Sequence, residues 1–395
     1  MGAILQQLSP AALLFVVIAA GCCAGRIRLR QVSLGIGAVL PCAVAAGYLL
    51  SLLPGGEGAA PESMNSFMET VSVLGTALFV SAVGLPAGGS AVRCGRKKGL
   101  QAFLFGSAVV CLGFVLMKGI GRLDEQMTPS ALAGMLSGAM TSTPGMSAAC
   151  ARPGLDSGEV ILGYACTYPF GLLFTALFVR FAAGREQADG AGEEPEKEKK
   201  MASTQTMASS MASPVAMPMA MPVAMPLLQI SLAAALGTAA GRLSIPGPGG
   251  SPVLFLGSTG GILLASLIIG AAVRRFWPDK QADPAALSLF RSLGLALFLA
   301  GSGIRAGERL QEAFSLRWLA YGAAMTALPV LLGYLAGKAL SCGSRTEAAC
   351  LTAGAMTSTP AAAILREQRP EADLGLYSAA YLGALLTMTV GQQLL

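Results

Sequence analysis

The heptapeptide Gly-Ala-Met-Thr-Ser-Thr-Pro occupies residues 138–144 and recurs unchanged at residues 354–360. Proline is disfavoured inside a helix but favoured in its first turn, and Ser and Thr are favoured as N-caps. We therefore predict that a helix ends near Met140 and that a second, short helix starts at Pro144, with Ser142 or Thr143 as its N-cap. The residues of the two predicted breaks are Thr141, Ser142, Thr143 and Pro144 in the first copy and Thr357, Ser358, Thr359 and Pro360 in the second.

The composition indicates a membrane protein. Charged residues make up 12% of the 395 residues, against about 25% in soluble domains, and hydrophobic residues make up 54%. Histidine is absent, which excludes His-ligated metal sites and His-dependent catalytic units, so we expect no metal, no cofactor and no enzymatic activity. Most of the nine cysteines fall in apolar stretches, which predicts small buried residues rather than disulfides or metal ligands.

The chain reads as a duplication. Residues 74–79 (Leu-Gly-Thr-Ala-Leu-Phe) match residues 293–298 (Leu-Gly-Leu-Ala-Leu-Phe), and the two heptapeptides follow in the same order at nearly the same offset. Six apolar stretches precede a mixed-charge and Met/Pro-rich segment, and six follow it. We divide the chain into a first membrane repeat (1–183), a disordered cytoplasmic tether (184–226) and a second membrane repeat (227–395).

The distribution of Lys and Arg favours an inverted repeat. If each heptapeptide segment is re-entrant, each half crosses five times and the basic residues divide 19 inside against 7 outside, leaving Arg291 aside. If every apolar stretch crosses, they divide 14 to 12. A discontinuous crossing helix would also give five crossings. We expect an all-α polytopic membrane protein with an inverted structural repeat, about five crossings plus a re-entrant or broken motif helix per half, and both termini outside.

The two breaks are the candidate substrate site. Non-helical backbone at membrane depth is tolerated only where it faces protein or an aqueous cavity. Hydroxyl groups and the positive N-terminal ends of helices can hold an anion there without a buried charged side chain. We predict that pseudo-symmetry brings the breaks together near the bilayer centre; a kink or a helix-packing feature is the alternative interpretation.

Several residues outside the heptapeptides have both a functional and a structural interpretation. Tyr164, Tyr168 and Tyr377 would line a substrate cavity or anchor the helices at the membrane interface. Arg291, about two turns into the ninth apolar stretch, would pair with a carboxylate or gate the site, or else snorkel to the interface. Three further charged residues are open between a role near the substrate and an interfacial one: Glu69, Arg152 and Arg366.

With these residues in view, the sequence resembles the aspartate–alanine exchanger family of bacterial secondary transporters. The doubled heptapeptide carries the resemblance together with residues 163–171, Gly-Tyr-Ala-Cys-Thr-Tyr-Pro-Phe-Gly, which look like the family's Gly-Tyr-Ala-x-x-Tyr-Pro-Phe-Gly. It covers both membrane halves. Many members have regulatory domains where this chain has its tether. In the second half, Tyr381 is followed by Leu-Gly, whereas Tyr168 in the first half is followed by Pro-Phe, so we expect an asymmetric site.

The resemblance implies a multi-pass carrier of the bacterial inner membrane that takes small carboxylates, such as aspartate exchanged for alanine, or a dicarboxylate such as succinate. By analogy we expect alternating access with an elevator-like motion of the motif-bearing part. A sodium- or proton-coupled symporter and a passive channel are the alternatives. The expected partners are a small anionic substrate and membrane lipid, with a homodimer left open and no nucleic acid.

Overall fold

The computed structural model describes residues 9–26, 28–29, 32–33, 35–52, 62–91, 96–184, 224–242, 244–246, 252–255, 257–308, 310, 317–369 and 372–394. Nearly all of the predicted tether lies outside these residues. The helices of the first half are α2 (Pro10–Ala24), η1 (Gly35–Ala38), α3 (Val39–Ser51), α4 (Glu62–Ala91), α5 (Arg96–Leu123), α6 (Pro129–Ala139), α7 (Thr143–Cys150) and α8 (Ser157–Gly184). Those of the second half are α11 (Ala224–Gly241), α12 (Gly257–Phe276), η2 (Pro278–Lys280), α13 (Pro284–Gly307), α15 (Arg317–Leu340), α16 (Arg345–Ala355), α17 (Thr359–Gln368) and α18 (Leu374–Leu394).

The predicted class, a duplicated all-α polytopic membrane protein, is confirmed. Within the described residues, seven helices are long and apolar enough to cross a membrane: α4, α5, α8, α11, α12, α13 and α15. Two short antiparallel β-ladders were not predicted. They pair β1 (Arg28–Leu29) with β2 (Val32–Ser33) and β3 (Ser244–Pro246) with β4 (Pro252–Phe255). They occupy equivalent links between successive helices, where so short a pairing leaves no pattern in the sequence.

The duplication is visible in how α4 crosses α13. A Cβ atom on Gly75 would lie 2.4 Å from the backbone N of Phe298, and one on Gly294 would lie 2.5 Å from the backbone N of Phe79. The two contacts are reciprocal, as expected of equivalent helices that cross at a pseudo-twofold axis. Glycine at both positions lets the backbones touch, which is how membrane helices gain packing energy without a hydrophobic driving force.

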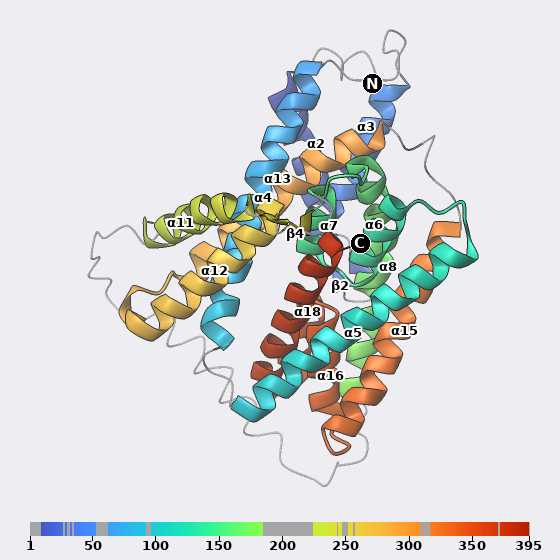
Figure 1. Cartoon of the computed structure of the whole chain (residues 1–395). Coiled ribbons are helices and arrows are strands. Elements are labelled where there is room, and N and C mark those ends of the chain that lie inside the picture. Colours follow the sequence, from blue (N-terminus) through green and yellow to red (C-terminus); the bar gives the residue numbers. More distant parts are fainter. Residues whose placement is uncertain are drawn as a thin grey trace.

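The helices form two groups. One, here called the scaffold body, contains α2, α3, α4, α11, α12 and α13, which pack mainly on one another. The other, the hairpin body, contains α5, α6, α7, α8, α15, α16, α17 and α18. Figure 1 shows α11 and α12 at the left of the molecule and α5 and α15 at the right. Each body therefore combines equivalent helices from both repeats.

The first heptapeptide lies at the tip of a re-entrant hairpin formed by α6 and α7. The backbone N–H of Asp156 donates to Ser130 Oγ at 2.9 Å, and Thr128 Oγ1 donates to Glu159 Oε2 at 2.5 Å. The start of α8 is thus beside the start of α6, so α6 enters the molecule and α7 returns to the same end.

The second hairpin, α16 and α17, enters from the opposite end. Near the start of α16, Glu347 forms an ion pair of 3.6 Å with Lys98 at the start of α5. Beyond α17, Arg369 donates from Nε and Nη2 to the carbonyl of Ala183 at the end of α8, both at 3.1 Å. Because α5 leads into α6 and α8 follows α7, these contacts place the second hairpin at the other end of both helices.

The expectation that the cysteines are buried is wrong for several of them. Cys22, Cys23 and Cys111 are exposed at the protein surface, and the eight described cysteines are all free. Apolar surroundings were taken to mean a protein interior, but the outer faces of membrane helices are apolar because they contact lipid.

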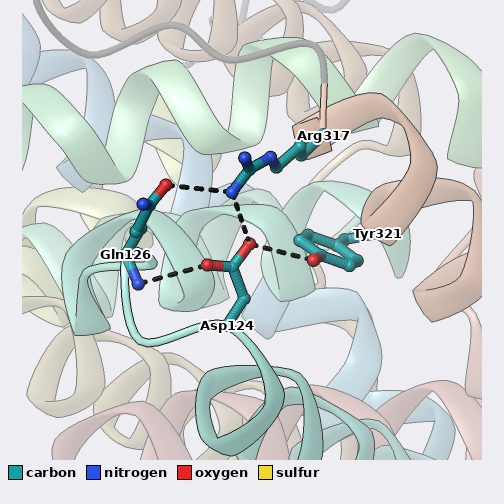
Figure 2. A network of polar contacts seen from close by, with 4 residues as sticks. All are labelled: Asp124, Gln126, Arg317 and Tyr321. Carbon is teal, nitrogen blue, oxygen red and sulfur yellow. Dashed lines mark hydrogen bonds and ion pairs between the residues drawn. The ribbon is translucent and has the colours of Figure 1, made fainter.

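A polar cluster at one end of the hairpin body joins α5 to α15 (Figure 2). Tyr321 donates from its hydroxyl to Asp124 Oδ2 at 2.9 Å, and Arg317 Nη1 lies 3.4 Å from the same oxygen and 2.9 Å from Gln126 Oε1. The hydrogen bond from Tyr321 lowers the pKa of Asp124 most, and the N–H of Gln126 and the charge of Arg317 lower it further against the opposing effect of burial.

We predict that Asp124→Asn lowers the melting temperature of the purified protein by about 1–3 °C at neutral pH. A carboxyl whose pKa is lowered by folding stabilises the folded state above its unfolded pKa, about 4, and loses that effect as the pH falls through the folded value. The gap between wild type and Asp124→Asn should therefore close below about pH 4. Glu125→Gln, on the exposed neighbour, is the control; a gap independent of pH would contradict the assignment.

Candidate functional site

Both heptapeptides break the helix where the sequence predicts. In the first copy α6 ends at Ala139 and α7 begins at Thr143; in the second α16 ends at Ala355 and α17 begins at Thr359. The serine, not the threonine, is the N-cap. Ser142 Oγ accepts from the backbone N–H of Gly145 at 3.3 Å, and Ser358 Oγ makes the same contact in the second copy. The prolines, Pro144 and Pro360, lie in the first turn of α7 and α17.

The turn at each break is closed by a Schellman motif with threonine in the left-handed position. The backbone N–H of Thr141 donates to Gly138 O at 2.9 Å, and that of Ser142 donates to Ser137 O at 2.8 Å. Thr141 has φ of 53° and Thr357, in the same arrangement, has φ of 48°. Glycine is the usual residue there, and a non-glycine residue costs about 1–3 kcal/mol. The threonine side chains must therefore contribute something that glycine lacks.

That contribution is a reciprocal pair of hydrogen bonds between the hairpin tips. Thr141 Oγ1 donates to the carbonyl of Met356 at 2.6 Å, and Thr357 Oγ1 donates to the carbonyl of Met140 at 2.9 Å. Both threonines are at most 9% exposed. Each Met carbonyl is freed by the end of its helix, so each tip satisfies a backbone acceptor of the other.

The structure thus brings the two breaks together, and in this conformation five of their six hydroxyl groups, all but that of Thr359, form hydrogen bonds within the described part of the chain. Ser142 and Ser358 cap their helices, and Thr143 Oγ1 lies 3.0 Å from the hydroxyl of Tyr164. A ligand would have to replace these hydrogen bonds.

The tyrosines of both repeats face the same region. Tyr164 and Tyr168 stack with ring centroids 5.0 Å apart, and Tyr377 and Tyr381 lie 5.8 Å apart in the equivalent place. Tyr164 is 1% exposed, which excludes interfacial anchoring for its side chain. The two pairs differ: Tyr164 bonds to Thr143, whereas the buried hydroxyl of Tyr377 has no hydrogen-bond partner in the described part of the chain.

Arg291 connects this region with the scaffold body. Its guanidinium lies near the side chains of Tyr168, Tyr377 and Tyr381. It also lines a cavity of about 260 Å³ among α4, α11, α12 and α13. Of the other charged candidates, Arg152 donates to the carbonyl of Gln392 at 3.3 Å, and the side chain of Arg366 lies outside the described residues.

Sequence reasoning missed two features around the first hairpin. Gln392 Nε2 donates to Ala133 O at 3.0 Å and to Ser137 Oγ at 2.9 Å, and Gln393 Nε2 donates to Ala148 O at 2.8 Å, so the end of α18 holds both arms of the hairpin. Arg305 of α13 lies 3.9 Å from Glu69 of α4 beside a hydroxyl-lined cavity. Two adjacent glutamines in the last apolar stretch were a usable signal; an arginine near the end of a span is too common to be one.

Comparison with known proteins gives one family and a set of partial relatives. The family model described as a predicted permease membrane region matches residues 13–184 and 229–395. An uncharacterized transporter of Rhodopirellula baltica is 34% identical over 176 residues, 44% of this chain and 30% of its own length. One of Geobacter sulfurreducens is 32% identical over 182 residues, 43% of this chain and 31% of its own length. The matches thus span less than a third of these relatives.

We predict that Thr141→Val or Thr357→Val lowers the free energy of unfolding by about 1–2 kcal/mol, because each leaves a buried carbonyl without a donor. Valine keeps the β-branched shape and therefore the backbone strain. Thr70→Val, which removes an exposed hydroxyl on α4, is the matched control. Denaturant titration in mixed micelles measures the difference. Equal stability of Thr141→Val and Thr70→Val would show that the tips do not depend on their mutual hydrogen bonds.

Proposed function

The chain belongs to the aspartate–alanine exchanger family of membrane permeases, and on that premise we propose that it is a secondary transporter that exchanges small carboxylates by alternating access. The observation that carries the proposal is the meeting of two re-entrant tips from opposite ends of the molecule, joined by the Thr141 and Thr357 hydrogen bonds. Inverted repeats whose broken helices meet at the centre suit a single site that is reached from either side.

The chemistry of the tips suits an anion. The N-termini of α7 and α17 point their first-turn N–H groups and the positive ends of their helix dipoles toward the breaks. When the tips separate, the hydroxyls of Thr141 and Thr357 become donors to a carboxylate in place of the Met carbonyls. Arg291 adds a positive charge among the tyrosines of both repeats. Aspartate, alanine and succinate are the substrates to test first.

The division into two bodies supports an elevator-like mechanism. Both hairpins lie in the hairpin body, so the site would move as a unit against the scaffold body. The proposed setting is the bacterial inner membrane, with the termini outside and the tether (184–226) in the cytoplasm.

The test is counterflow in liposomes that contain the purified full-length protein. Vesicles loaded with unlabelled aspartate, alanine or succinate are diluted into labelled substrate, with and without a sodium gradient. We expect labelled substrate to accumulate only when the interior holds an exchangeable acid, and without need of sodium. Absence of counterflow with every acid would contradict exchange, and accumulation that requires sodium would favour a symporter.

A second measurement ties transport to the tips. We expect Thr141→Ala combined with Thr357→Ala to reduce the counterflow rate by about tenfold or more, since each hydroxyl bond to a charged group is worth about 1.5–3 kcal/mol. Thr70→Ala is the control and should transport like wild type. Unchanged counterflow in the double variant would make the motif structural rather than substrate-binding.

A further inference from the structure

A second cavity, of about 380 Å³, lies between α7 and α8 of the hairpin body and α4, α11, α12 and α13 of the scaffold body. Ligand pockets span about 300–1,000 Å³, so it suits a small molecule. Eight hydroxyl groups line it; those of Ser157, Thr238 and Ser258 are on more exposed residues, and the other five are on residues at most 9% exposed. These five belong to Ser72 and Thr76 of α4, Ser147 of α7, Thr259 of α12 and Ser302 of α13.

These hydroxyls bond to one another across the boundary between the two bodies. Ser147 Oγ on the hairpin lies 3.0 Å from Thr259 Oγ1 and 3.4 Å from Thr76 Oγ1 on the scaffold. Within the scaffold, Ser72 Oγ and Ser302 Oγ are 2.5 Å apart. A hydroxyl donates one hydrogen bond and accepts others, so each can turn toward a ligand. A ligand here would contact both bodies at once.

One ion pair lies beside the hydroxyls. Arg305 Nη1 is 3.9 Å from Glu69 Oε2, and their side chains are 31% and 64% exposed. That separation is longer than a hydrogen bond, and an exposed pair of this kind contributes little free energy. In the described part of the chain the guanidinium forms no hydrogen bond, so its five N–H donors are available to an incoming group.

We propose that this cavity binds a small carboxylate. Arg305 binds the carboxylate group, and the five buried hydroxyls bind the remaining polar groups of the ligand. When the cavity is empty, Glu69 pairs with Arg305 instead. The inference rests on the proposed function and gives it a second anion site beside the first hairpin. Arginine matches a carboxylate through two parallel N–H···O bonds, which the loose pair with Glu69 does not make.

The position of Ser147 gives the site a role in movement. The hydrogen bonds of Ser147 to Thr259 and Thr76 hold the returning arm of the hairpin against the scaffold. A carboxylate that takes over these hydroxyls replaces direct contacts between the bodies with contacts to itself. Binding would thereby loosen the hairpin body from the scaffold body.

The experiment measures binding without transport. Purified full-length protein is titrated with succinate and, separately, with aspartate, and the ligand-dependent rise in melting temperature gives an apparent Kd. Arg305→Gln should weaken binding by about 10- to 100-fold, because the charge-assisted hydrogen bonds to the carboxylate are lost. Arg305→Lys should weaken binding by less, because it keeps the positive charge. Glu69→Gln should tighten binding by about two- to fivefold, because a weak competing ion pair is removed.

Arg305→Gln is expected to weaken binding and Glu69→Gln to tighten it. Damage to the fold would not change the apparent Kd in opposite directions, so the pair of variants separates the two explanations. Arg242→Gln and Glu125→Gln, which alter exposed charges elsewhere, are the controls and should leave the apparent Kd unchanged. If wild type binds either acid and both Arg305→Gln and Glu69→Gln stay within twofold of it, the cavity is not the site. If neither acid raises the melting temperature of wild type, the cavity proposal is overturned, while counterflow alone decides the proposed function.

Discussion

The structure depends on how backbone carbonyls are satisfied at the centre of an apolar molecule. Each re-entrant helix ends far from water, and an unpaired carbonyl there costs free energy that no solvent recovers. The Thr141 and Thr357 hydroxyls supply the missing donors, each to the other repeat. Because a tip is complete only when its counterpart is in place, the position of both hairpins and the packing of α6, α7, α16 and α17 follow from this exchange.

The sequence was sufficient for the helical fold class and for the location of the breaks, but not for the two short β-ladders. Proline and serine preferences are local, so they predicted the end of α6 and the start of α7 to within a residue. The repeat offset and the Lys and Arg distribution predicted two inverted halves. The choice of Ser142 over Thr143 as N-cap was left open, because either residue can cap a helix and only the backbone geometry of the turn decides between them.

The candidate site was predictable in its position but not in its contacts. The hydrogen bond from Thr141 to Met356 joins residues 215 positions apart. The spacing of residue types along the sequence does not predict such a contact. Ser72 and Ser302 lie in the long apolar helices α4 and α13, and Ser147 lies in the short helix α7. Serine is common at the packing faces of membrane helices, so none of the three marks a site in the sequence. The ion pair of Arg305 with Glu69 joins helices from different repeats, so neither residue shows its partner in the sequence.

The exchange of contacts between the repeats has a consequence for how such a chain can have arisen. α4 crosses α13, α5 packs on α18, and each hairpin tip needs an acceptor from the other repeat, so neither half encloses a core of its own. A single-copy ancestor would have had to insert in the bilayer in both orientations and pair head to tail with itself. Fusion of two copies ensures that every protein contains one repeat in each orientation. It also allows each repeat to diverge, and Tyr164 and Tyr377 already differ in their hydrogen bonding.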